Sequence, residues 1–179
     1  MLKKSTILAA AAFGLVGYGA STVQAAPATD KQWELTLVGS GASDNEFDSN
    51  TIGATAQVGY YFTDAMQANL RQSFSTSGGD TTEGTWSAST AVGFDYHFDF
   101  GQDQRIIPFV GAAIGYNYGE DTNDTFFAGP EAGVKFYVND TTFIFGQVAY
   151  QFFFEDSDDA DDAFEDGSFV YSIGVGFRF

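Results

Sequence analysis

The charged side chains that could do chemistry fall on one face of the predicted strands. The chain has only seven lysine and arginine residues, and three of them occupy positions that a period of two places on the polar face of a strand. Three carboxylates share that face. Buried charges are tolerated when they are paired and hydrogen-bonded, so this pattern predicts ion pairs in an enclosed interior. The six residues of this inner polar network are Glu34, Arg71, Asp95, Glu131, Lys135 and Arg178.

Two pairings within the inner polar network follow from position along the strands. Glu34 and Arg178 lie near the same ends of the first and last strands, so we expect them to be near neighbours. Arg71 and Glu131 lie at mid-height on their strands, which suggests a second pair. One interpretation of the network is a gated or narrow polar path, and the other is a structural plug.

The single histidine is the only candidate for acid–base catalysis. Asp95 and Ser89 share the face of His97, but His97 lies at the end of its strand. General acid–base chemistry needs an adjacent nucleophile and a pocket, and the sequence indicates neither. A structural histidine is the favoured interpretation, and we predict no catalytic residue and no cofactor.

The densest acidic run covers residues 155–166. Its carboxylates meet the demand of divalent cations for hard oxygen ligands. It lacks the alternation and the central glycine of an EF-hand loop, so no dedicated metal site is implied. A solvated loop is the favoured interpretation, with weak divalent-cation binding as the alternative. The candidates for such binding are Asp156, Asp158, Asp159, Asp161 and Asp162.

Composition and the N-terminus limit the class of protein. The formal net charge of −17 repels phosphate backbones, which excludes a basic nucleic-acid surface. Lys3 and Lys4 precede an apolar stretch and then small residues up to Ala25, which is the pattern of a secretory signal peptide. We therefore expect residues 1–25 to be a signal peptide and residues 26–179 to form one domain. The chain has no cysteine, so an exported form would be held without disulfides.

Eight segments of alternating apolar and polar residues supply the strands that position these side chains. Each is about ten residues long or slightly more, the length expected of a strand that crosses a membrane. An even number of strands places both ends of the domain on the same side. The sequence therefore predicts an all-β fold, an eight-stranded antiparallel up-and-down transmembrane β-barrel. The segments are 32–41, 52–62, 66–74, 85–98, 106–118, 126–138, 143–154 and 169–179.

The connections between the segments alternate in kind. Short turns are expected at 63–65, 99–104 and 139–141, and longer polar loops at 42–50, 76–84, 119–124 and 155–168. This asymmetry is typical of outer-membrane barrels, in which short turns face the periplasm and long loops face the outside.

The apolar face of each strand is predicted to meet lipid, because the other face is too polar for hydrocarbon. Aromatic residues gather toward the ends of the apolar face, as in the girdles at membrane interfaces. An eight-stranded barrel has an interior only wide enough to be filled by side chains, which favours the plug over the path. The alternative is a soluble lipocalin-like barrel with its aromatic residues inside. Arg71, Glu131, Lys135 and Arg178 on the opposite face argue against it.

Four segments resemble the small outer-membrane β-barrel family, the OmpA/OmpX/OmpW-like outer membrane protein β-barrel domain. They are Val58–Asp64, Pro108–Tyr116, Gly129–Asp140 and Ser172–Phe179. The resemblance implies export by the general secretory route and a location in the bacterial outer membrane, with outer-membrane lipid as a partner. It also implies assembly by the outer-membrane insertion machinery, which would read a C-terminal signal, and it carries over no catalytic residues. The residues of that signal are Tyr171, Ile173, Val175, Phe177 and Phe179.

Three functions remain open at this point, because fold alone does not give function. The first is a non-enzymatic structural or surface-interaction barrel with acidic extracellular loops and a filled lumen. The second is a narrow channel for ions or small solutes. The third is an outer-membrane lipid-modifying enzyme.

Overall fold

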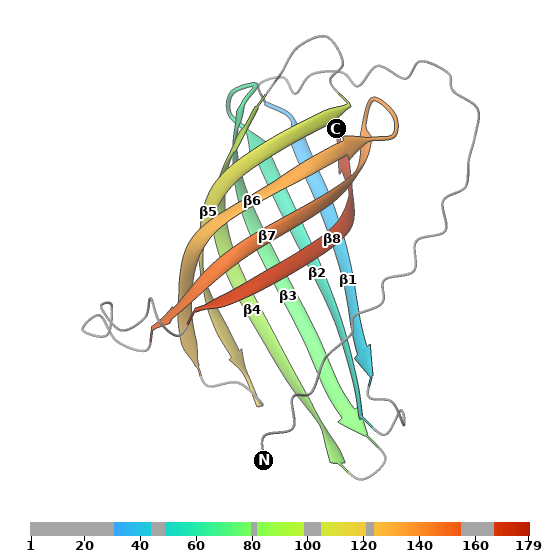
Figure 1. The fold of residues 1–179 in the computed structure, drawn as a ribbon, viewed down its shortest axis with the longest axis vertical. Helices are drawn as coiled ribbons and strands as arrows, with labels where there is room; N and C mark the ends of the chain where they lie inside the picture. Colours follow the sequence, from blue (N-terminus) through green and yellow to red (C-terminus); the bar gives the residue numbers. More distant parts are fainter. Residues whose placement is uncertain (1–30, 44–48, 80–81, 99–104, 121–123, 155–166) are drawn as a thin grey trace, which may run out of the picture.

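The fold is a closed antiparallel barrel of eight strands (Figure 1). Each strand pairs with the next one in the chain, and β8 returns to pair with β1, which is the predicted up-and-down order. The computed structural model describes residues 31–43, 49–79, 82–98, 105–120, 124–154 and 167–179. These residues include no helix of the length and hydropathy needed to cross a membrane. The strands are β1 (Trp33–Ser43), β2 (Ser49–Tyr61), β3 (Met66–Gly79), β4 (Thr82–His97), β5 (Ile106–Gly119), β6 (Thr125–Tyr137), β7 (Thr142–Phe154) and β8 (Ser168–Arg178).

The barrel closes where the last strand meets the first. Glu34 on β1 lies directly opposite Arg178 on β8. One residue further, Trp33 and Phe179 exchange two backbone hydrogen bonds, each 2.9 Å from nitrogen to oxygen. The C-terminal residue is thereby held in the sheet. Over the paired stretch of this seam, Glu34–Val38 with Gly174–Arg178, closure supplies backbone partners to both strands.

The two ends of the barrel differ. The turns β2–β3 and β6–β7 lie at the same end as the C-terminus, which we call the turn end; the opposite end is the loop end (Figure 1). The side-chain oxygen of Thr63 accepts the backbone N–H of Met66 at 3.0 Å. In the same way, the side-chain oxygen of Asn139 accepts the N–H of Thr142 at 2.7 Å. These side chains replace a backbone partner and make tight turns possible.

The hairpin of β3 and β4 corrects the predicted loop at 76–84. Ser77 pairs with Thr85, and Gly79 pairs with Thr82 after a shift in register. This stretch is rich in Ser, Thr and Gly, so it lacks the apolar alternation by which a strand is recognised. Pairing continues nevertheless, because each strand offers backbone partners to the other and Thr suits a sheet. The β1–β2 connection is shorter than predicted for the same reason.

The apolar face of the strands points outward and the polar face points into the bore, as predicted. Large apolar side chains point outward, and Ile52 and Tyr171 are 67% and 77% exposed. Both tryptophans, Trp33 and Trp86, also lie on this outer face. The residues of the inner polar network point into the bore, where Arg71 is half-buried and the other five are buried, such as Glu131 at 3% exposed. The soluble alternative, with apolar groups inside and charges outside, does not describe this arrangement.

One part of the bore is more apolar than predicted. The inward face was expected to be too polar for hydrocarbon, but at the turn end it carries five packed aromatic side chains, which we call the aromatic floor. None of the five is more than 6% exposed, and Ile107 packs with them. Apolar burial of this kind stabilises the barrel from inside. The residues of the aromatic floor are Tyr61, Phe109, Tyr137, Phe143 and Phe145.

Candidate functional site in the bore

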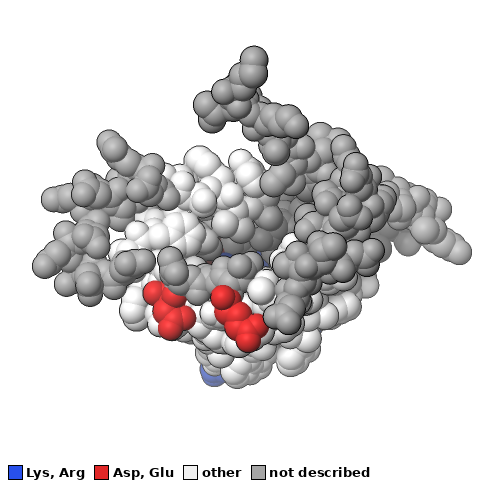
Figure 2. All heavy atoms as spheres, turned by 90° about the horizontal axis from the view of Figure 1, so that it is seen from below, with Lys and Arg blue, Asp and Glu red and all other residues white. Residues whose placement is uncertain are grey.

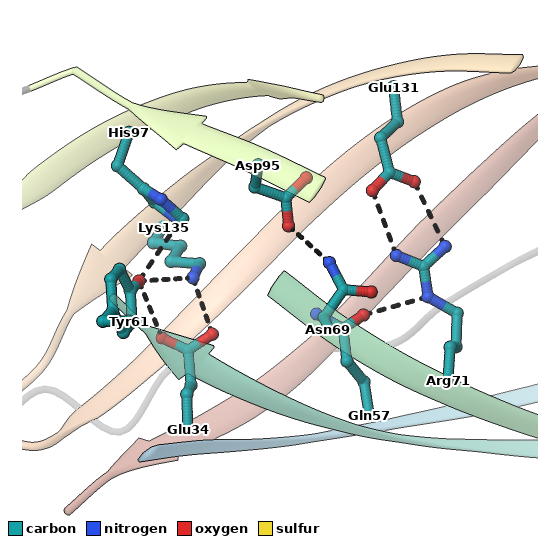
Figure 3. Close-up of polar contacts among 9 residues, drawn as sticks. All are labelled: Glu34, Gln57, Tyr61, Asn69, Arg71, Asp95, His97, Glu131 and Lys135. Carbon is teal, nitrogen blue, oxygen red and sulfur yellow. Dashed lines mark hydrogen bonds and ion pairs between the residues drawn. The ribbon is translucent and has the colours of Figure 1, made fainter. Parts of the chain in front are cut away.

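Two clusters of polar side chains lie at different heights in the bore (Figure 3). The cluster nearer the turn end contains Lys135, and the other, at mid-height, contains Glu131. Both residues are on β6 and point inward, four positions apart, which is about 13 Å along a strand. In each cluster the ion pair joins strands that are not neighbours, β1 with β6 and β3 with β6, so these contacts cross the interior of the barrel.

The turn-end cluster is built around a buried ion pair. Lys135 Nζ lies 2.6 Å from Glu34 Oε1, and both side chains are at most 4% exposed. Lys135 Nζ also donates to the hydroxyl of Tyr61 at 3.0 Å, and that hydroxyl donates to Glu34 Oε2 at 3.1 Å. Both oxygens of the carboxylate therefore have a partner. A buried pair needs such additional hydrogen bonds to offset the loss of water.

His97 completes this cluster. Its Nε2 lies 3.2 Å from the hydroxyl of Tyr61. That hydroxyl donates its one hydrogen to Glu34, so it can only accept from His97. The imidazole proton of His97 therefore lies on Nε2, which donates to Tyr61. The side chain is 4% exposed, and its ring packs 5.5 Å from the ring of Phe109. These contacts enclose the ring of His97, which agrees with the interpretation of a structural histidine.

The aromatic floor surrounds the ammonium group of Lys135. Its Nζ lies 5.1 Å from the ring centre of Phe143, 5.5 Å from that of Tyr61 and 5.6 Å from that of Phe109. Ring faces attract a cation at such distances. Ring contacts, the ion pair and the hydrogen bonds together fill the bore at the turn end with side chains.

The mid-height cluster contains the expected pair of Arg71 and Glu131. Arg71 Nη1 and Nη2 lie 3.1 Å and 3.2 Å from the two carboxylate oxygens, a bidentate arrangement. Gln57 accepts from Arg71 Nε at 2.9 Å, and Gln147 donates to Glu131 at 2.6 Å. The planar guanidinium group matches a carboxylate in this geometry, so the pair is both strong and directional.

The remaining members of the inner polar network lie beside these clusters. Arg178 is the cross-strand neighbour of Glu34, as expected, and its guanidinium carbon lies 4.7 Å from the ring centre of Tyr137. Asp95 accepts a hydrogen bond from Asn69 Nδ2 at 2.8 Å.

The sequence did not indicate that Lys135 would take Glu34 as its partner. The strands that carry them are far apart in the sheet, and only the tilt of a closed barrel sets which residues face each other.

Between the mid-height cluster and the loop end, the bore contains open space. A cavity of about 360 Å³, which we call the outer cavity, lies between inward-facing residues of β1 to β5. A smaller space of about 100 Å³, the inner chamber, lies next to it and contacts Arg71. Thr55, Ser73 and Ser89 line both spaces, so the two are adjacent. Sequence reasoning missed this feature, because small hydroxyl residues were expected to sit in a filled interior.

The structure does not bring the other sequence candidates for chemistry together. Ser89 shares the face of His97 but is eight positions away, about 26 Å along the strand, and it lines the outer cavity instead. Among the residues described, no three His, Asp or Glu side chains are grouped so that they could hold a metal ion. The acidic candidates Asp156, Asp158, Asp159, Asp161 and Asp162 and the predicted signal peptide lie outside the described residues.

This geometry defines a class: small up-and-down β-barrels with a polar bore. Crystal structures with this fold include the N-terminal β-barrel domain of OprF from Pseudomonas aeruginosa, with a TM-score of 0.55 and 21% sequence identity over 84% of this chain and 98% of that one. The outer membrane protein OprG from the same organism has a TM-score of 0.54 and 12% identity, over 84% and 97%. At these identities the likeness shows the fold, which is the one that the sequence resemblance implied. No family model and no curated protein matches the chain.

Proposed function

We propose that the protein is a non-enzymatic β-barrel of the bacterial outer membrane, with a structural or surface-interaction role and a bore closed at the turn end. Export with cleavage after Ala25 and assembly through the C-terminal signal are parts of this proposal. In this orientation the turn end faces the periplasm and the loop end faces the outside, so the acidic loops are presented to the medium.

The outer face carries the proposal of a membrane location. Large apolar side chains are exposed on all eight strands, among them Leu37, Ile52, Leu70 and Val92 at 45% to 67%. A continuous apolar surface of this extent is costly in water and favourable in lipid. Gln72 and Thr90 also point outward, but Thr90 donates to the side-chain oxygen of Gln72 at 2.7 Å, and Gln72 donates to the hydroxyl of Tyr118 at 3.0 Å. Such polar groups are tolerated in lipid when they have partners.

The contacts within the bore support closure rather than conduction. Lys135, Glu34 and the aromatic floor fill the turn end, and Arg71 with Glu131 crosses the bore at mid-height. A solute entering from the loop end would have to separate two ion pairs and displace buried rings. Separating a buried pair is costly because each charge is left without its partner. We therefore do not favour the channel.

Cell fractionation combined with gel mobility tests the location and the fold together. We expect the protein to pellet with outer membranes and to change its mobility on boiling, as a folded barrel does. Recovery in the soluble fraction, with no effect of boiling, would refute the membrane assignment.

Conductance recording separates the closed barrel from the channel. Purified protein inserted in a planar lipid bilayer is expected to give no reproducible current steps. Regular steps at a fixed conductance would establish the channel instead. Lipid analysis of cells with and without the gene tests the enzyme, for which we expect no difference.

A further inference from the structure

The outer cavity has the size and chemistry of a binding site. Its volume of about 360 Å³ lies in the range of small-molecule sites. The walls carry hydroxyl side chains from four adjacent strands, and Asn117 of β5 adds an amide. The hydroxyl residues are Ser40, Thr55, Ser73, Ser75, Ser87 and Ser89.

We propose that the outer cavity binds a small neutral polyhydroxylated solute, of the size of one or two sugar rings. A hydroxyl group both donates and accepts, and its hydrogen rotates to suit the partner. Thr55 donates to Ser73 at 2.8 Å, and Ser75 and Ser87 share a hydrogen bond of 2.7 Å. Each of these oxygens retains acceptor capacity. A ligand that is itself rich in hydroxyl groups can use that capacity from several directions at once.

The charge around the cavity selects a neutral ligand. Among the residues that the structure describes, those that line the outer cavity are all uncharged. The cation that the inner chamber adds, Arg71, is already held by both oxygens of Glu131. An ionic solute would lose part of its hydration without gaining an opposite charge, which is unfavourable. Figure 2 views the molecule from the loop end, where the described surface is mostly uncharged, with acidic side chains at the rim.

The inner chamber adds groups that suit a sugar ring. Gln147 and Gln151 supply amides, and the rings of Phe127 and Phe145 supply apolar walls. A sugar has polar hydroxyl edges and a less polar face, so it can meet both kinds of wall. Arg71, held in the mid-height ion pair, and Phe145 of the aromatic floor bound this space on the side toward the turn end. The site is thus open toward the loop end and closed below, which suits binding and not passage.

Nuclear magnetic resonance of the refolded protein in detergent micelles tests this proposal. Glucose is the probe, and glucuronate and glucosamine are its charged counterparts. We expect saturable amide shifts in β2, β3 and β4 with glucose, at an affinity of about millimolar for a ligand this small, and none with the charged sugars. A core oligosaccharide released from lipopolysaccharide distinguishes a glycolipid headgroup from a free solute, and we expect no binding of it. No saturable shift with glucose, equal shifts with the charged sugars, or binding of the oligosaccharide alone would overturn the proposal.

Two variants on β3 give a matched comparison. Ser75→Leu fills the cavity, whereas Ser77→Leu changes the next inward position, which does not line it. The first should abolish the glucose shifts and the second should retain them. If Ser75→Leu fails to fold, Ser73→Ala removes one hydroxyl without adding volume, and it should weaken binding several-fold. Shifts that persist in a folded Ser75→Leu would contradict the site. The amide shifts are measured in micelles and depend on neither conductance nor insertion in a cell membrane. A negative result for sugar binding would therefore leave the proposed function standing, and the two proposals can fail separately.

Discussion

Lys135 and Glu34 form an ion pair across the interior of the barrel, with 2.6 Å between Nζ and Oε1, although they lie on β6 and β1. Neither side chain is more than 4% exposed. The pair joins two strands that share no backbone hydrogen bonds. It therefore links opposite walls at the turn end, within the aromatic floor.

Breaking this pair is expected to destabilise the barrel strongly. Lys135→Met leaves the carboxylate of Glu34 buried without its cation, at a cost of about 3–5 kcal/mol. The double variant Glu34→Gln/Lys135→Met removes both charges and should recover most of that loss. Urea unfolding in detergent, followed by tryptophan fluorescence, measures the difference. The exposed Glu120→Gln is the control, with an expected change of about 0.5 kcal/mol or less. A single variant as stable as the control would show that the pair contributes little.

Removing the mid-height ion pair is not expected to open the bore. In Arg71→Ala, the aromatic floor and Lys135 still close the turn end. We expect no steady current from this variant in a planar bilayer. Phe143→Ala together with Arg71→Ala removes a side chain from each level, and this double variant should be more permeable. Steady current from Arg71→Ala alone would mean that the mid-height pair is the true barrier.

Gly129 on β6 is expected to tolerate no side chain. A Cβ atom added there would collide with the backbone carbonyl oxygen of Tyr150 on β7. Backbone cannot move aside as a flexible side chain can, so Gly129→Ala should impair folding. Gly146→Ala is the matched control, because nothing lies within 4 Å of the added atom. Boiling-dependent gel mobility reports the folded fraction. Equal yields of the two folded variants would disprove the constraint.

We expect Phe179 to matter more for assembly than Phe169, a similarly exposed aromatic residue near the start of β8. Phe179 is 72% exposed and Phe169 is 63% exposed. Phe179 exchanges backbone hydrogen bonds with Trp33 and belongs to the predicted assembly signal. Phe179→Ser should reduce the amount of protein in the outer membrane several-fold, and Phe169→Ser should do so much less. Quantitative blotting of membrane fractions measures both. Equal losses would argue against a terminal signal.

The sequence was sufficient to predict the strands and their sides, because a period of two is visible wherever one face is apolar. It could not show that β3 and β4 continue through Ser77 and Thr85, where both faces are polar. Position along a strand indicated that Arg71 would meet Glu131. It did not indicate the pairing of Lys135 with Glu34, which depends on the tilt of the strands.

The interior was the least predictable part of the barrel. The alternation places Phe143 and Phe145 on the inward face, but it cannot show that they pack with Ile107 and Tyr137 into an apolar cluster. The outer cavity depends on the small size of several serines that come from separate strands. Their convergence becomes visible only once the barrel is closed.

Quenching of tryptophan fluorescence tests most directly the claim that the outer face meets lipid. The chain has two tryptophans, Trp33 and Trp86, and both are on the outer face, 47% and 38% exposed. The variant Trp86→Phe leaves Trp33 as the one reporter, and Trp33→Phe leaves Trp86. In vesicles, we expect lipids brominated on their acyl chains to quench the fluorescence of each tryptophan, and aqueous iodide to have little effect. Strong quenching by iodide with none by the brominated lipids would contradict the account.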